Sequence, residues 1–91
     1  MANMINIGFG NFVNAQKVVA VVNPDAAPIK RLVQNARELQ KVIDATQGRR
    51  TKSVLVMETE QIVLSAMQPD TVARRFAASQ MTEMEMKGEE Q

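Results

Sequence analysis

The chain has 91 residues, 3% aromatic residues and a net charge of +1, and it contains neither Cys nor His. A chain of this length suits one domain with a small core. The absence of Cys excludes disulfides and thiolate chemistry, and the absence of His removes the commonest general base and metal ligand, so the composition speaks against an enzyme. Because we find no apolar run long enough to span a membrane and no signal peptide, we expect a soluble cytoplasmic protein.

The charges are distributed unevenly along the chain. Residues 81–91 hold four Glu and one Lys, a net of −3, whereas residues 1–80 hold ten cations and six anions, a net of +4. A basic body fits a polyanionic partner. The sequence predicts a single α+β domain over residues 1–80, followed by an acidic, disordered tail over residues 81–91.

The first third of the chain reads as two strands separated by a turn. Residues 4–7 alternate as in a short strand and lead into the turn residues 8–11, Gly-Phe-Gly-Asn. The GxG does not fit a dinucleotide-binding fingerprint, because no third small residue and no helix follow it. A Val-rich strand over residues 18–22 is the clearest, with Lys17 at its leading edge and Asn23-Pro24-Asp25 closing it.

Pro28 predicts the start of a helix over about residues 29–40, because Pro is favoured in a first turn. Apolar residues recur there at helical spacing and form one stripe. Residues 53–57 and 61–65 predict a hairpin whose turn holds two acids. Since no His, Cys or further acid is near those two acids in sequence, an exposed turn is favoured over an acid–base pair. The segment 68–71, Gln-Pro-Asp-Thr, opens a last helix.

The most distinctive stretch is 44–52, Asp-Ala-Thr-Gln-Gly-Arg-Arg-Thr-Lys, which lies between two apolar runs. Gly48 permits a positive φ, so the stretch predicts a hairpin loop. Arg49, Arg50 and Lys52 would then project from the tip toward an anionic partner. The alternative is a solvated turn that is basic only for solubility.

The predicted order β-β-α-β-β-β-α, with short connections, indicates an antiparallel-rich α+β domain. The strands over 18–22, 54–57 and 62–64 are continuously apolar, which is typical of strands buried on both faces. Two short helices can cover only one face of the sheet. We therefore expect the other face to be covered by further copies of the chain, in a homo-oligomer larger than a dimer.

Four blocks of the sequence, in order, resemble the RemA-like family of small bacterial regulators, named for a regulator of extracellular-matrix genes. The blocks are residues 5–11, 28–31, 43–51 and 64–73. The resemblance implies a ring of subunits with a LytTR-like fold that binds double-stranded DNA on its outer rim, on the nucleoid, and regulates extracellular matrix or biofilm genes. The family's DNA-contacting positions match Lys17, Arg49 and Arg50; at the first, Lys replaces the family's Arg and loses the bidentate fork.

The resulting prediction is a DNA-binding transcriptional regulator without enzyme activity, cofactor or metal. Its DNA-binding residues are predicted to be Lys17, Arg49, Arg50 and Lys52. Two alternatives stay open from the residues alone. One is an oligomeric adaptor whose basic tip pairs with an acidic protein, and the other is a regulator that binds RNA or a small anion.

Overall fold

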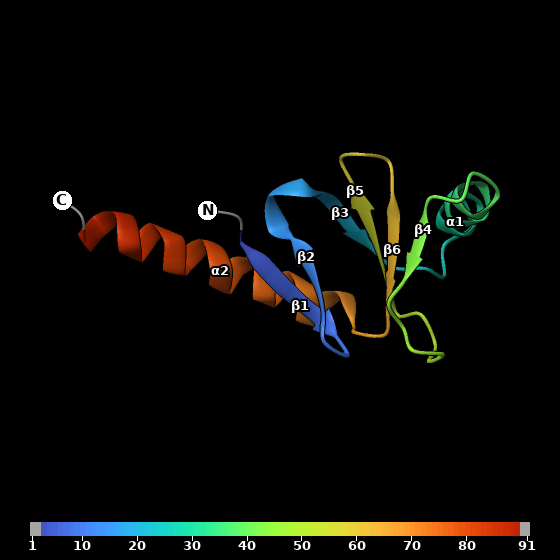
Figure 1. Cartoon of the computed structure of the whole chain (residues 1–91). Coiled ribbons are helices and arrows are strands. Elements are labelled where there is room, and N and C mark those ends of the chain that lie inside the picture. Colours follow the sequence, from blue (N-terminus) through green and yellow to red (C-terminus); the bar gives the residue numbers. More distant parts are fainter. Residues whose placement is uncertain (1–2, 90–91) are drawn as a thin grey trace.

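The computed structural model describes residues 3–89, and for residues 80–89 it describes the backbone alone. The elements are β1 (Met4–Gly8), β2 (Asn11–Asn14), β3 (Val18–Val22), α1 (Ala27–Glu38), β4 (Val42–Asp44), β5 (Ser53–Met57), β6 (Ile62–Ser65) and α2 (Pro69–Glu89). A short 3-10 helix, Ala15–Lys17, precedes β3. Strands β1 and β2 form a two-stranded antiparallel sheet, and the other four form a sheet in the order β3-β5-β6-β4 (Figure 1).

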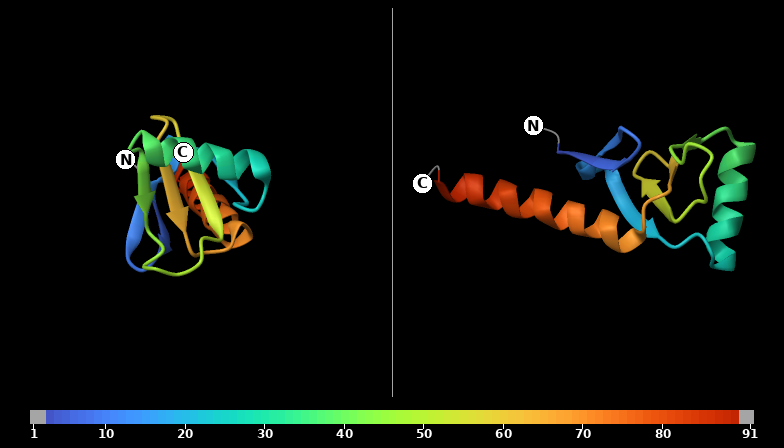
Figure 2. Two further views of the ribbon diagram at one scale, coloured as in Figure 1. Left: turned by 90° about the vertical axis from the view of Figure 1, so that its right-hand side faces the viewer. Right: turned by 90° about the horizontal axis from the view of Figure 1, so that it is seen from below.

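The four-stranded sheet lies between two layers (Figures 1 and 2). Because successive side chains of a strand point to opposite faces, β5 and β6 supply both layers with apolar groups. Val54, Ile62 and Leu64 pack with Ala36 of α1 on one face. On the other face Leu55 packs with the hairpin of β1 and β2 and with α2, in a cluster that also contains Ile5, Ile7, Val13, Val63 and Val72.

This arrangement corrects the prediction that one sheet face requires another subunit. Val54 and Leu55, on opposite faces of the sheet, both have a relative exposure of 0% in the single chain. The hairpin of β1 and β2 provides the missing cover, because it lies against the sheet as a separate layer and does not join it. An uncovered sheet face is therefore no argument for oligomerisation.

The predicted α+β class with two helices is confirmed, and so is the antiparallel hairpin of β5 and β6. The predicted order of elements is wrong by one strand, since β2 forms a separate strand that pairs with β1. Its sequence, Asn-Phe-Val-Asn, holds only two apolar residues and gives a weak strand pattern.

The prediction of a hairpin between residues 42–43 and 54–57 is also wrong. Strand β4 pairs with β6, in parallel, and β6 lies between β4 and β5. The segment 45–52, which we term the basic loop, therefore crosses the end of β6. It is a crossover connection and not a hairpin tip.

Helix α2 begins at Pro69, as predicted, and leaves the body of the molecule as a projecting helix (Figure 1). Its backbone is helical as far as Glu89, where the sequence predicts a disordered tail. The side chains of residues 80–91 lie outside the described part, and the domain boundary at residue 80 stays a prediction. Neither helix, over the residues described, is long and apolar enough to cross a membrane.

Candidate nucleic-acid interface

The basic loop is fixed at both ends to β6. The Ala45 N–H donates to the Leu64 carbonyl at 2.9 Å, and the Lys52 N–H donates to the Ser65 carbonyl at 2.9 Å. Ala45 and Thr46 are buried, with exposures of 4% and 2%. The loop is thus held by a buried start and a paired end, which leaves its middle on the surface.

A local hydrogen-bond cluster sets the turn that follows. The Thr46 hydroxyl and N–H both donate to the Asp44 carboxylate, at 2.6 and 2.9 Å. The hydroxyl bond, then the N–H bond, lowers the pKa of Asp44 below its ordinary value, and the charge of Arg37 adds to the effect. Gln47 and Gly48 then take positive φ angles of 55° and 76°, which turn the chain outward.

The turn displays three cations. Arg49, Arg50 and Lys52 are exposed side chains. Arg50 lies 3.8 Å from the Asp25 carboxylate, in the connection before α1, whereas Arg49 and Lys52 form no ion pair within the described residues. An exposed pair as long as that of Arg50 stabilises by at most about 1 kcal/mol, so the guanidinium is readily available to another anion.

Two hollows adjoin these cations. One, of about 330 Å³, is lined by Phe9, Arg49, Arg50, Lys52 and Ala66. The other, of about 170 Å³, is lined by residues of three connections that meet at this end of the sheet: Asn23, Pro24, Asp25, Arg50, Thr51, Lys52 and Gln68. An anionic ligand in either hollow would meet Arg50 and Lys52, which line both.

Lys17 lies at the other end of the four-stranded sheet. It precedes β3, whose first residue Val18 pairs with Met57, whereas the basic loop joins β5 at Ser53. Four residue steps of β5 separate the two ends, roughly 13 Å along the strand. The Lys17 ammonium pairs with Glu58 at 2.9 Å. The structure therefore brings Arg49, Arg50 and Lys52 together and leaves Lys17 apart from them within one chain.

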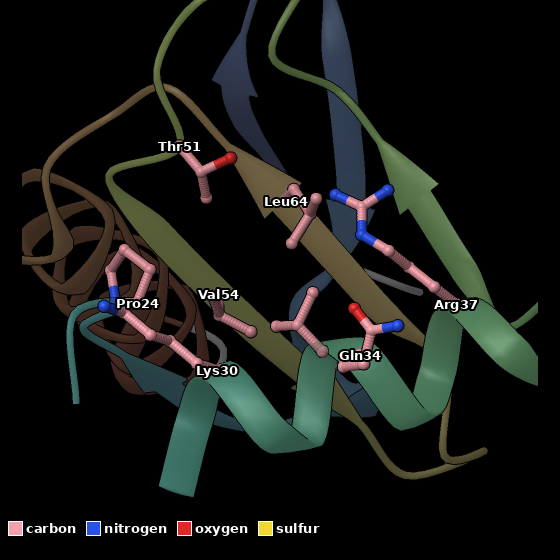
Figure 3. Close-up of a pocket in the computed structure, with 8 residues that line it drawn as sticks. Pro24, Lys30, Gln34, Arg37, Thr51, Val54 and Leu64 are labelled. Atoms are coloured by element: carbon pink, nitrogen blue, oxygen red, sulfur yellow. The ribbon is translucent and has the colours of Figure 1, made fainter. Parts of the chain in front are cut away.

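A further cavity lies between α1 and the sheet (Figure 3). It measures about 200 Å³, and Val54 and Leu64 form part of its wall. Lys30 and Arg37 are two turns apart on α1 and lie at opposite ends of the cavity (Figure 3). A small anion at either end would meet one of these cations, beside a wall that contains the polar residues Gln34 and Thr51 as well as apolar ones. No group of three or more His, Cys, Asp or Glu side chains in residues 3–79 could hold a metal ion.

Apolar side chains are exposed at both edges of the four-stranded sheet. Val19 on edge strand β3 is 67% exposed, and Ile43 on the opposite edge strand β4 is 49% exposed. Near β4, Leu39 is 66% exposed and lines an open apolar groove of about 320 Å³.

The sequence predicts the cations of the basic loop but not Phe9 as their neighbour. Two hydrogen bonds tie the hairpin of β1 and β2 to this end of the sheet: the Ser65 hydroxyl donates to the Ile7 carbonyl at 2.7 Å, and the Asn11 amide donates to the Ala45 carbonyl at 3.5 Å. The sequence predicts only a plain turn at residues 8–11. An aromatic residue between two glycines at a hairpin tip was the available signal, since such a ring cannot be buried by its own strands.

These features define a small α+β protein with a fixed, cationic loop at one end of its sheet. The chain belongs to the RemA-like family, described as extracellular matrix regulatory protein A-like, whose model matches residues 4–76. This confirms the resemblance.

Three relatives extend the comparison. Proteins of Geobacillus kaustophilus, Acetivibrio thermocellus and Crocosphaera subtropica, named "Putative regulatory protein" (with GK1166 in the first), are 51%, 49% and 53% identical to this chain. The matches cover 87%, 97% and 87% of this chain and 91%, 95% and 88% of the relatives. These names are those of regulatory proteins and not of enzymes.

Proposed function

We propose that the chain is a transcriptional regulator that binds double-stranded DNA as a homo-oligomer, through Arg49, Arg50 and Lys52. The single observation that carries the proposal is the basic loop, which holds three exposed cations on a backbone anchored by buried residues. Guanidinium groups suit phosphate oxygens because their donors match phosphate geometry. The family description, extracellular matrix regulatory protein A-like, supports a regulatory role. We extend the proposal to extracellular matrix and biofilm genes as targets and to the nucleoid as the place of action.

The charge distribution favours duplex phosphates over a single small anion. Arg49, Arg50 and Lys52 lie on an open surface, and the two hollows that they line lie between loops. Contacts of this kind add up along a polyanion and release counterions, so affinity falls steeply with salt. They position the protein on DNA without reading its sequence.

Lys17 belongs to the proposal as a second, separate contact. Its distance from the basic loop, roughly 13 Å or more, is similar to the width of a DNA major groove, about 12 Å. One chain would then contact different phosphates from the two ends of its four-stranded sheet. Because the ion pair of Lys17 with Glu58 is exposed, replacing the carboxylate by a phosphate costs little free energy.

The oligomer is proposed to be a ring, and the exposed apolar edges support it. Strands β3 and β4 are the two edges of one sheet and carry Val19 and Ile43. Two different surfaces that fit each other give a head-to-tail contact, which closes into a ring when the rotation between subunits allows. A ring repeats the basic loop, and linked weak contacts raise overall affinity by 10²–10⁴ or so. The LytTR-like relationship of the subunit fold is part of the same proposal.

Two measurements on the full chain test the proposal. Salt titrations compare its binding to duplex DNA, duplex RNA and an acidic polypeptide. We expect tightest binding to duplex DNA. Equal binding to the acidic polypeptide would favour a protein adaptor, and tighter binding to RNA would favour an RNA-binding regulator.

Light scattering tests the oligomer. We expect a discrete species larger than a dimer. Val19→Asp should dissociate it without unfolding the subunit, because the side chain is exposed. Thr59→Asp, in the exposed turn between β5 and β6, is the matched control and should leave the oligomer intact. A folded monomer for the unchanged chain at micromolar concentration would contradict the ring.

A further inference from the structure

The exposed ring of Phe9 stands beside the binding cations. Phe9 is 52% exposed at the tip of the hairpin of β1 and β2. It lines the hollow of about 330 Å³ together with Arg49, Arg50 and Lys52. That volume lies at the lower end of the range for small-molecule sites, about 300–1,000 Å³. An aromatic face and three cations thus border one space.

The backbone holds Phe9 there at a conformational cost. Gly8, Phe9 and Gly10 all take positive φ, of 108°, 55° and 75°. The left-handed region is unfavourable for a residue with a Cβ, but the two-residue loop between Gly8 and Asn11 has positive φ at both of its residues, as hairpin turns favour, so the turn itself places Phe9 at the tip. The turn is nevertheless well determined, because the Gly8 N–H donates to the Asn6 side chain at 2.8 Å and the Asn11 amide donates to the Gly8 carbonyl at 3.0 Å.

The same Asn11 amide also reaches the Ala45 carbonyl, at the start of the basic loop. Together with the shorter bond from the Ser65 hydroxyl to the Ile7 carbonyl, at 2.7 Å, this contact orients the hairpin tip relative to the cations. The position of the ring beside Arg49 and Arg50 is therefore a built feature of the fold.

A nucleotide has the two chemical parts that this hollow accommodates. Its phosphate suits the guanidinium groups, and its base has a π-face that stacks on an aromatic ring whatever the base. A perfect duplex keeps its base faces stacked, so a contact to a face requires a base that has left the stack.

We propose that Phe9 contacts the face of an unstacked base while Arg49, Arg50 and Lys52 hold the adjacent phosphates. The proposal rests on the proposed DNA-binding function and adds a preference to it. The protein should bind most tightly where DNA presents an unpaired base, such as a single-nucleotide bulge.

Phe12 provides a matched control. It is 50% exposed on β2 of the same hairpin, and it does not line the hollow that Phe9 shares with Arg49, Arg50 and Lys52. The same substitution at both positions removes the same ring from equally exposed sites.

The experiment measures fluorescence anisotropy of two labelled DNAs, a perfect duplex and the same duplex with one bulged nucleotide. The unchanged full chain should prefer the bulged duplex, on the scale of one stacked base, by roughly 5- to 150-fold. Phe9→Leu should lose that preference and keep its affinity for the perfect duplex. Phe9→Tyr, which retains a ring, and Phe12→Leu should keep the preference.

Three outcomes would overturn the inference. The first is equal binding of both DNAs by the unchanged chain, which requires no variant and holds even if Phe9→Leu fails to fold. The second is an equal effect of Phe9→Leu and Phe12→Leu. In both cases, weaker binding of both DNAs by Arg50→Ala would show that the protein binds DNA as proposed, although Phe9 does not contact a base. The third is no DNA binding at all, which removes the proposed function and the inference together.

Discussion

The two ends of the four-stranded sheet both carry cations, but the cations differ in what they contact. At one end Lys17 pairs with Glu58 at 2.9 Å and Lys41 pairs with Glu60 at 3.4 Å, so each cation has an acid in the turn between β5 and β6. At the other end Arg50 has the Asp25 carboxylate at 3.8 Å, whereas Arg49 and Lys52 form no ion pair within the described residues. A polyanion therefore meets paired cations at the first end and, beside Arg50, two cations without an ion pair at the second.

The difference shows that net charge along a sequence is a poor guide to the charge a partner meets. Lys17 and Arg50 look alike in the sequence, as exposed cations near strand ends. The antiparallel pairing of β3 with β5 places Glu58 beside Lys17, because Val18 is opposite Met57. Whether such a cation has an acidic partner is decided by the strand register and not by the local sequence.

The largest expected effect comes from removing the charge of the basic loop. Replacing Arg49 and Arg50 together by Ala should lower affinity for duplex DNA by about tenfold for each phosphate that is no longer neutralised at 0.1 M salt. The slope of log affinity against log salt should become shallower by about 0.9 per phosphate. Stability should change by less than about 0.5 kcal/mol per site, because both side chains are exposed. A salt titration and a thermal melt measure the two quantities.

Arg74→Ala is the control for a merely basic surface. Arg74 is an exposed arginine on α2, and its guanidinium bonds only to its own helix within the described residues. Affinity and salt slope should be unchanged. If Arg74→Ala weakens binding as much as the double replacement does, the protein has no localised DNA-binding site.

A smaller effect is expected at the paired end. Lys17→Ala should weaken duplex binding less than Arg50→Ala does, because binding by Lys17 must first displace the Glu58 carboxylate. Glu58→Gln should strengthen binding slightly, since it frees Lys17, and this gain should vanish in the Lys17→Ala background. Equal losses for Lys17→Ala and Arg50→Ala would contradict the distinction between the two ends.

The elements of this fold were largely predictable from sequence, but their pairing was not. The Val-rich strand β3, the strands β5 and β6 and the start of α2 follow from short-range patterns, and the structure contains them. Strand β4 has three residues, Val-Ile-Asp, which fit a hairpin with β5 as well as they fit the observed parallel pair with β6. Local sequence carries no information on that choice. In the observed parallel pair, half-buried Val42 packs against the cluster of Ala36, Val54, Ile62 and Leu64.

The candidate site was predictable to the same degree. Arg49, Arg50 and Lys52 are adjacent in sequence and stay together whatever the loop type. The location of Lys17 at the far end and of Phe9 beside the cations depends on contacts between residues far apart in the chain, such as Asn11 with Ala45. Such contacts leave no periodic pattern in the sequence.

The smallest effect is expected from the hydrogen bonds that shape the basic loop. In the folded chain the Thr46 hydroxyl, then the Thr46 N–H, lowers the pKa of Asp44, so the ionised carboxylate stabilises the fold above its unfolded pKa of about 3.9. This contribution is lost as the pH falls through the lower, folded pKa.

Asp44→Asn keeps an acceptor without the charge. Its Tm at pH 7 should be lower than that of the unchanged chain by at most a few degrees, because solvent screens the exposed carboxylate, and the difference should shrink as the pH drops below about 4. In a Thr46→Val background the same substitution should cost less, because the principal donor to Asp44 is gone. A Tm difference that grows on acidification would mean that Asp44 does not stabilise the loop as a carboxylate.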